Sequence, residues 1–251
     1  MFKGNGYAFV QATKYANLSK SDNELEKPQP PLEIPLEEGK PLIDLPRPED
    51  IDLGSYDLRK AIEERRSLRR YTDDPLTLEE LSYLLWLTQG VKSIDEKRKV
   101  TWRTVPSAGA RHPFETYLSV NNVGGLERGL YRFVASQHKL VSLRPDETFN
   151  ERLTDASLGQ RSIATSAVTF IWVAIPERTI WRYAERSFRY LYLDAGHVCQ
   201  NLSLAAESIH CGVCAIGAYN DDAVDELLGL TPPEKFAIYM APVGRRGEPK
   251  K

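Results

Sequence analysis

The residues best suited to chemistry in this chain are arginines grouped around one serine: Arg65, Arg66, Ser67 and Arg69. A guanidinium group presents five donors in a planar fork, and its bonds to phosphate are about twice as strong as bonds between neutral groups. The group follows a short predicted helix, where cations also interact with the negative end of the helix dipole. The sequence therefore predicts either a phosphate-binding site or a solvated basic helix end.

Two further arginines, Arg245 and Arg246, stand between glycines directly after the last predicted strand. Backbone amides and guanidinium groups can bind an anion in such a place. The alternative is a solvated C-terminal segment. If both arginine groups face one phosphate, each makes phosphate binding by the other a stronger prediction.

A loop that begins at Pro106 is built from small residues, namely Ser107, Ala108, Gly109 and Ala110. Small side chains let a ligand approach the backbone closely, so a flat ring system can lie against this loop. The alternative is an ordinary turn that enters the following strand.

Charged and phenolic side chains precede the longest predicted helix, in the run from Arg182 to Tyr190. Tyr183 and Tyr190 can each donate or accept a proton. The alternative is a helix start with a surface rich in salt bridges.

Cys211 and Cys214 have a spacing that is also found in zinc sites and dithiol pairs, with His210 beside them. A structural zinc site needs a second pair at short spacing, and the sequence has none. A redox-active pair opens a helix, whereas this pair enters a predicted strand. We therefore interpret these cysteines as small core residues and expect no metal site.

Length and composition favour one α/β domain or two small ones. The 251 residues include 33 basic and 35 acidic side chains, a formal net charge of −2, so no overall field attracts nucleic acid. No apolar run approaches the roughly 18 residues that a membrane span needs, and the N-terminus has no apolar signal region. With three cysteines, an odd number, we expect a reduced, cytoplasmic protein. The sequence also lacks the GxGxxG and Walker motifs of common nucleotide sites.

Hydrophobic patterns and caps predict the elements that position these residues. Thr77 and Glu80 form a capping box for a helix that ends at Gly90. Strands are predicted at 114–120, 129–134, 139–143, 167–175, 213–219 and 236–243. The longest helix is predicted over 188–209, about 33 Å, and a charged loop over 92–99. Hairpins mixed with helical crossovers predict an α+β fold with a mixed sheet.

The first 56 residues differ from the rest, because prolines and acidic residues are concentrated at 28–50. Proline fixes φ and removes a donor, so we expect an extended arm over 1–56 that can reach a second subunit. One domain over 57–247 and a tail over 248–251 complete the predicted organisation.

In order and spacing, several segments resemble motifs of the nitroreductase family of flavoproteins, and most closely its SagB-type branch, dehydrogenases that aromatise azoline rings in modified peptides. These segments are 64–70, 106–110, 158–160, 183–202, 215–219 and 242–245. The resemblance runs over residues 56–246. It implies a three-layer α/β/α fold with a mixed, mostly antiparallel sheet, a long central helix and an intertwined homodimer.

The resemblance also implies one FMN site at each subunit interface, with no nucleic acid or membrane partner. Arg65, Arg66, Ser67 and Arg69 would hold the phosphate, ribityl and pyrimidine oxygens, and Arg245 or Arg246 would complete the phosphate clamp. The partner subunit would supply the loop with Pro106, Ser107, Ala108 and Gly109. Gln160, with Arg161, would face the polar edge of the isoalloxazine, and Ile216, Gly217 and Ala218 would lie over the ring.

Hydride transfer at flavin N5 is the chemistry that the resemblance implies, with a small molecule or peptide as substrate. In azoline-oxidising members a Lys-Tyr pair is thought to assist proton removal, and this chain has Arg182 and Tyr183 at the matching place. Arginine is a poor base, so Tyr183 is the residue expected to relay a proton. The alternatives are an NAD(P)H-dependent nitro or quinone reductase and a non-catalytic flavin-binding subunit of a peptide-modifying complex. A phosphate-binding regulatory module is a weaker reading.

Overall fold

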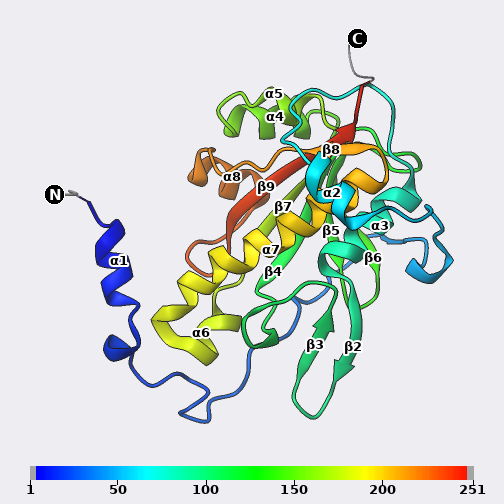
Figure 1. The fold of residues 1–251 in the computed structure, drawn as a ribbon. Helices are drawn as coiled ribbons and strands as arrows, with labels where there is room; N and C mark the ends of the chain where they lie inside the picture. Colours follow the sequence, from blue (N-terminus) through cyan, green and yellow to red (C-terminus); the bar gives the residue numbers. More distant parts are fainter. Residues whose placement is uncertain (1–3, 248–251) are drawn as a thin grey trace.

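A seven-stranded sheet forms the centre of the protein in the computed structural model, which describes residues 4–247 (Figure 1). Residues 1–3 of the predicted arm and the predicted tail over 248–251 lie outside the described residues. The strands, in spatial order, are β1 (Leu42–Asp44), β6 (Lys139–Pro145), β5 (Gly129–Val134), β4 (Phe114–Val120), β7 (Val168–Ala174), β9 (Phe236–Arg245) and β8 (Cys211–Val213). All the strand pairs in this sheet are antiparallel.

The central strand β7 is buried on both faces, and its side chains alternate between two hydrophobic cores. Phe170 and Trp172 belong to one core, whereas Ile171 and Val173 belong to the other. Successive residues of a strand point to opposite faces, so an apolar strand of this kind needs helices on both sides of the sheet.

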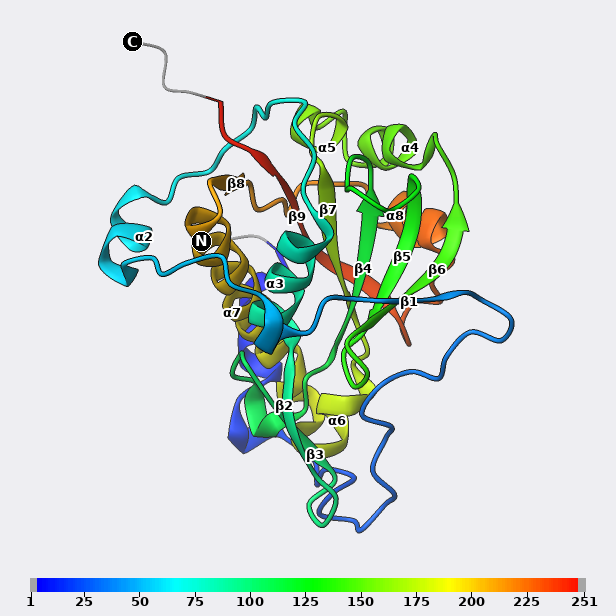
Figure 2. The ribbon, with the colours of Figure 1, turned by 90° about the vertical axis from the view of Figure 1, so that its right-hand side faces the viewer.

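Helices supply both covering layers, which confirms the predicted three-layer arrangement (Figure 2). One layer contains α2 (Leu58–Glu64), α3 (Leu78–Gln89) and the long helix α7 (Ser187–Ser208). The other contains α4 (Phe149–Ala156), α5 (Arg161–Ala164) and α8 (Asp221–Leu228). The capping box that starts α3 is present, since Thr77 Oγ1 accepts from the Glu80 amide and Glu80 Oε2 accepts from the Thr77 amide.

Two predicted segments differ from the structure. The predicted loop at 92–99 is part of a separate hairpin, β2 (Val91–Asp95) and β3 (Val100–Arg103), whose turn is fixed by an Arg98 amide donating to Asp95 at 2.9 Å. Its charged side chains are mostly exposed. The segment therefore lacks the alternation of apolar and polar residues that predicts a strand. The predicted strand at 213–219 is wrong, because β8 ends at Val213. Pro242 of β9 lies opposite Cys214, the residue after β8. Because proline has no backbone N–H, it cannot donate the hydrogen bond that would continue the pairing.

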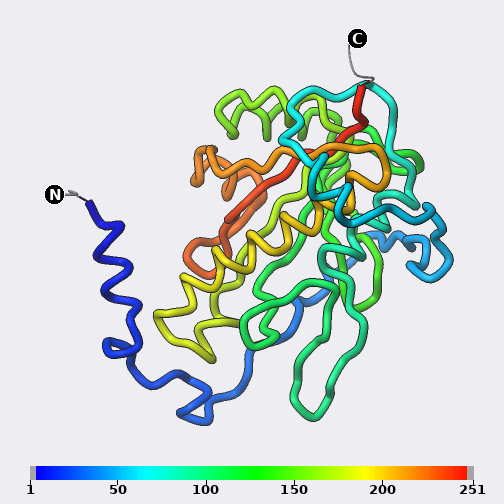
Figure 3. Tube along the Cα trace, in the orientation of Figure 1, coloured from blue at the N-terminus to red at the C-terminus, as the bar shows by residue number. Residues whose placement is uncertain are grey.

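The N-terminal residues run around the body and end in the edge strand β1, as the blue trace in Figure 3 shows. They begin with α1 (Gly6–Ala12). Buried arginines hold the proline-rich part: Arg132 pairs with Glu37 at 2.7 Å, and Arg178 donates to the Pro31 carbonyl at 3.0 Å. None of the helices described between residues 4 and 247 has the length and apolar character of a membrane span.

Candidate functional site

The predicted phosphate-binding residues lie directly after α2, where the chain packs on the edge of the sheet. The Leu68 amide donates to the Val213 carbonyl at 2.9 Å. Two glycines make this close approach possible: a Cβ on Gly212 would lie 2.4 Å from Leu68, and a Cβ on Gly244 would lie 2.6 Å from the Tyr71 ring. The backbone next to the arginines is therefore fixed on β8 and β9.

Arg65, Arg66, Ser67, Arg69 and Arg70 are called the arginine cluster here. Their side chains make no ion pair or hydrogen bond with any residue between 4 and 247. Arg69 and Arg70 line a cleft of about 570 Å³ together with Gln160 and Arg161. The structure thus brings the predicted Arg69, Gln160 and Arg161 together, and adds Arg70, which the sequence did not single out. Unpaired guanidinium groups around one cleft are suited to an anion.

The C-terminal arginines differ from the arginine cluster because each is paired with a carboxylate of the same chain. Arg245 binds Glu80 at 2.6 Å and donates to the Ile209 carbonyl at 3.0 Å. Arg246 pairs with Glu207, which is buried. A phosphate contact by either arginine would compete with these carboxylates.

The segment after β8 presents backbone to solvent. Ile216 is buried and exchanges two backbone hydrogen bonds with Met240, at 2.8 and 3.1 Å. Gly217 and Ala218 are exposed, and a Cβ on Gly217 would have no atom closer than 3.8 Å. A flat ligand can therefore reach this backbone without moving side chains.

The small-residue loop lies at the start of α7, away from the arginine cluster. Asp194 of α7 accepts from Ser107 Oγ at 2.6 Å and from the Ala108 amide at 3.1 Å. Burial raises the pKa of Asp194 above its ordinary value, and these bonds offset only part of that effect. The Ser107 hydroxyl also accepts from the His112 amide at 2.9 Å, so the loop is held at several points.

Gly109 allows this loop to contact the predicted catalytic residues at the end of α6 (Glu177–Tyr183). Its φ is +58°, and a Cβ there would lie 2.5 Å from Tyr183 Oη and 2.9 Å from Arg182 Cδ. Ser107, Ala108, Gly109, Arg182 and Tyr183 are called the loop cluster here. The structure places these five predicted residues together within one chain.

A second phenol and an arginine lie next to Tyr183. The Tyr183 and Tyr190 rings pack edge to face at 4.8 Å, and the Tyr190 hydroxyl is 3.1 Å from that of Tyr15 and accepts from Arg186 at 3.0 Å. Burial acts to raise the pKa of Tyr190, but the hydrogen bonds from Tyr15 and Arg186 lower it below its ordinary value. Tyr15 belongs to the N-terminal segment, which the sequence did not connect with the site.

The arginine cluster and the loop cluster lie at opposite ends of α7 (Figure 1). Asp194 holds the loop cluster, whereas the C-terminal end of α7 at Ile209 contacts Arg245 beside the arginine cluster. Those two positions are about 22 Å apart along the helix axis at 1.5 Å per residue. A single chain therefore does not bring the two clusters into one small site.

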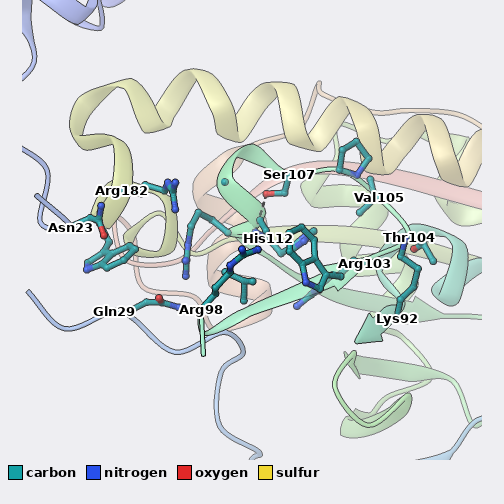
Figure 4. Close-up of a pocket in the computed structure, with 17 residues that line it drawn as sticks. Asn23, Gln29, Lys92, Arg98, Arg103, Thr104, Val105, Ser107, His112 and Arg182 are labelled. Carbon is teal, nitrogen blue, oxygen red and sulfur yellow. Dashed lines mark hydrogen bonds between the residues drawn. The ribbon is translucent and has the colours of Figure 1, made fainter. Parts of the chain in front are cut away.

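Beside the loop cluster lies a larger cleft of about 920 Å³ (Figure 4). Its walls are the β2–β3 hairpin, the segment from Thr104 to His112, and α6 with part of the N-terminal segment. The sequence left the position of the charged segment 92–99 open, and the structure places its Lys92 and Arg98 on this cleft. The basic residues of 92–103 were a usable signal, but their meaning depended on the hairpin.

The three cysteines are free thiols buried in the core. Burial raises the pKa of both Cys199 and Cys211 to about 12, which keeps them protonated at neutral pH. No cluster of three or more potential metal ligands occurs among residues 4–247.

Comparison with known proteins shows the family of the chain. The family model described as "Nitroreductase family" matches residues 62–245, well over half of the chain. The chain belongs to the nitroreductase family. It is 38% identical over 197 residues to MJ1384 of Methanocaldococcus jannaschii, a protein with a nitroreductase name, and this match covers 78% of the chain and 95% of that protein.

Two further relatives extend this comparison. The trifolitoxin-processing protein TfxB of Rhizobium leguminosarum bv. trifolii is 32% identical over 134 residues, 52% of the chain and 36% of TfxB. A crystal structure from Anabaena variabilis, also with a nitroreductase name, superposes with a TM-score of 0.64 at 32% identity and covers 76% of this chain. The chain corresponds to only 38% of that Anabaena protein.

Proposed function

We propose that this nitroreductase-family protein is an FMN-dependent oxidoreductase whose site is completed by two subunits. The observation that carries the proposal is the position of the two clusters at opposite ends of α7. In a twofold dimer, the arginine cluster of one subunit can face the loop cluster of the other, and symmetry then produces two equal sites.

The residues of the first half fit a flavin mononucleotide. Arg65, Arg69 and Ser67 would hold its phosphate and ribityl oxygens, since their side chains have no partner within residues 4–247. Gln160 and Arg161 would meet the polar edge of the ring from the other wall of the cleft. Gly217 and Ala218 would offer exposed backbone to the face of the ring.

The α7 surface supports a dimer. Tyr192 and Leu193 are 61% and 58% exposed in a single chain, although both lie in the longest helix of the structure. Adjoining large apolar side chains that are exposed on a helix are typical of a protein interface. The three free thiols also fit a reducing compartment such as the cytoplasm.

FMN, when bound, supplies hydride transfer at N5. The chain's own contribution at the loop cluster is to hold a proton at Tyr183 Oη, next to the Gly109 backbone. The Arg182 guanidinium can orient an anionic group but is a poor base. Similarity to TfxB favours a modified peptide as substrate and a SagB-type reaction, the oxidation of azoline-like rings.

A second candidate is an NAD(P)H-dependent nitro or quinone reductase, favoured by the similarity to MJ1384 along 95% of that protein. A non-catalytic flavin-binding subunit of a peptide-modifying complex is the third. Stopped-flow mixing with NADH and NADPH separates the first two, because only the reductase must bleach its flavin rapidly with a nicotinamide. Unchanged turnover of every accepted substrate by Tyr183→Phe and Arg182→Gln would favour the third.

The absorbance spectrum of the purified full chain tests the proposal. We expect a yellow protein that releases FMN on denaturation, with one FMN per chain, and a dimer by sedimentation. A colourless protein that takes up no added FMN would overturn the proposed cofactor, and a flavin-loaded monomer would overturn the shared site.

A further inference from the structure

The charged side chains that line the cleft beside the loop cluster are all basic. Of the 17 residues that line it, five are lysine or arginine and none is aspartate or glutamate: the basic residues are Lys92, Arg98, Arg103, Arg111 and Arg182. Arg98 makes a loose pair with Asp95 at 3.8 Å. The other four have no ion pair among residues 4–247. With a net charge of −2 for the whole chain, this local excess is not a reflection of overall composition.

Arg111 shows that the positive charge extends into the buried wall of the cleft. Its side chain is 1% exposed, its Nε donates to the Arg178 carbonyl at 3.1 Å, and its Nη2 has no partner among the described residues. An unmatched buried donor of a charged group costs free energy unless a ligand supplies the acceptor. Burial and then the nearby Arg182 and Arg178 lower the pKa of Arg111 to about 10, so it remains charged at neutral pH.

Aromatic surfaces accompany the cations. The Arg111 guanidinium lies 5.1 Å from the Trp181 ring centroid, and Trp102 on the hairpin is 44% exposed although it lines the cleft. The N-terminal segment completes the wall, since the Trp181 indole donates to the Lys27 carbonyl at 2.9 Å and the Asn23 amide donates to the Trp181 carbonyl at 2.7 Å. Figure 4 shows Arg98 and Lys92 on the hairpin wall, with Arg182 at the opposite side.

We propose that this cleft binds an acidic peptide segment of the substrate and directs it to the loop cluster. The cations are spread along the cleft from the hairpin to Arg182. They can therefore pair with several carboxylates of an extended peptide, whereas a single small anion would contact only some of them. A cleft of about 920 Å³ is also large enough for several residues. This inference rests on the proposed oxidoreductase function, because it assigns the substrate class of that same site.

Fluorescence anisotropy on the full-length protein tests the proposal. The probes are a fluorescein-labelled Glu-Gly-Glu-Gly-Glu peptide and its Gln-Gly-Gln-Gly-Gln counterpart. We expect the acidic peptide to bind at least tenfold more tightly at low salt, and this preference to weaken as salt is raised. The double variant Lys92→Gln with Arg98→Gln should weaken binding about three- to tenfold, as expected for two partly exposed charges.

Lys97→Gln is the matched control, because Lys97 is an exposed lysine of the same hairpin that does not line the cleft. It should leave binding unchanged. Equal binding of the two peptides, or equal losses in Lys97→Gln and the double variant, would overturn the proposal. Displacement of the acidic peptide by lower concentrations of NADP⁺ than of unlabelled peptide would also overturn it, in favour of a phosphate site.

The flavin spectrum keeps this test separate from that of the proposed function. Lys92 and Arg98 lie outside the arginine cluster, so the double variant should keep its full FMN content. A yellow protein with no preference for the acidic peptide would refute only the cleft. A colourless protein would refute the oxidoreductase, and with it the role of the cleft as a substrate site.

Discussion

The arginine cluster and the loop cluster differ in how many contacts their side chains make within the chain. The arginine cluster is exposed or half-buried, and its side chains have no partners among residues 4–247, although its backbone is fixed on β8 and β9. The loop cluster has the opposite character. Its Ser107 hydroxyl and Ala108 amide are bound to a buried carboxylate, and Gly109 packs against Tyr183.

This difference indicates a division of roles between the two ends of α7. Unpaired guanidinium groups remain available for an anionic cofactor, and gain free energy only when it binds. A loop whose hydrogen bonds are already made holds its neighbours in a fixed position, which is what proton transfer and substrate orientation require. Conservative substitutions at the first end should therefore affect cofactor retention. Conservative substitutions at the second end, which leave the space for the flavin open, should affect turnover.

The largest effect is expected from Gly109→Ala. The new Cβ would lie 2.5 Å from Tyr183 Oη at a φ of +58°, so Tyr183 and Arg182 must move. Displacement of a catalytic group by about 1 Å can cost about a hundredfold in rate. We expect a loss of about that size in turnover with unchanged FMN content, measured by steady-state kinetics on any substrate that the wild type accepts.

Gly125→Ala is the control for Gly109→Ala. Gly125 also has a positive φ, of +85°, but a Cβ there would meet no atom within 4 Å. It should therefore lose some stability from backbone strain and keep its turnover. Equal loss of turnover in both variants would show that strain, and not contact with Tyr183, explains the effect.

A smaller effect is expected from Arg69→Gln. Removal of one charge-assisted bond at this exposed position should weaken FMN binding about tenfold, at the low end of the range for bonds to charged groups. Equilibrium dialysis or fluorescence titration of the apoprotein with FMN measures this change. Arg59→Gln is the control, since Arg59 is exposed on α2 and is paired with Glu63 at 2.8 Å. If both variants bound FMN like the wild type, Arg69 would not be a ligand.

The smallest effect is expected from Asp194→Asn. Because burial raises the pKa of Asp194 in the folded state, its contribution to stability is complete below the ordinary value of 3.8 and is lost as the pH rises through the raised value. The asparagine variant lacks this titration. We expect the free energy of unfolding of the wild type, relative to the variant, to decrease as the pH rises above 3.8.

Urea unfolding of both proteins between pH 4 and pH 7 measures this difference. Parallel pH profiles would contradict a raised pKa for Asp194. A large loss of FMN from Asp194→Asn would contradict the separation of roles, since Asp194 contacts only the loop cluster among the predicted site residues.

Local signals in the sequence predicted much of the fold. The Thr77–Glu80 capping box, the β5–β6 hairpin and the long helix depend on neighbouring residues, and each is present within two residues of its predicted place. The short β8 was not predictable, because it ends where Pro242 of another strand lies opposite. Helix α6 was missed because its burial comes from packing on distant segments and not from a regular apolar pattern.

The candidate site shows the same limit. Residue types, spacing and the family resemblance selected every member of the two clusters except Arg70. The structure brings Arg69 close to Gln160, and Gly109 close to Tyr183. The basic cleft required the β2–β3 hairpin and Arg111 to be placed in space. Arg245 pairs with Glu80, more than a hundred positions away, and Arg246 pairs with Glu207, about forty positions away. No local sequence pattern predicts contacts over such separations.

Flavin counting in a heterodimer tests the shared site most directly. One chain carries Arg65→Gln with Arg69→Gln, and the other carries Ala108→Trp, with different affinity tags so that the heterodimer is purified by both. Each homodimer should be folded by circular dichroism and nearly free of FMN. The first lacks the guanidinium groups that hold the cofactor, and in the second the added indole fills the space that the flavin needs. In the heterodimer the intact arginine cluster of one chain meets the intact loop of the other, so we predict one FMN per two chains. A heterodimer without FMN would contradict a site built from two subunits.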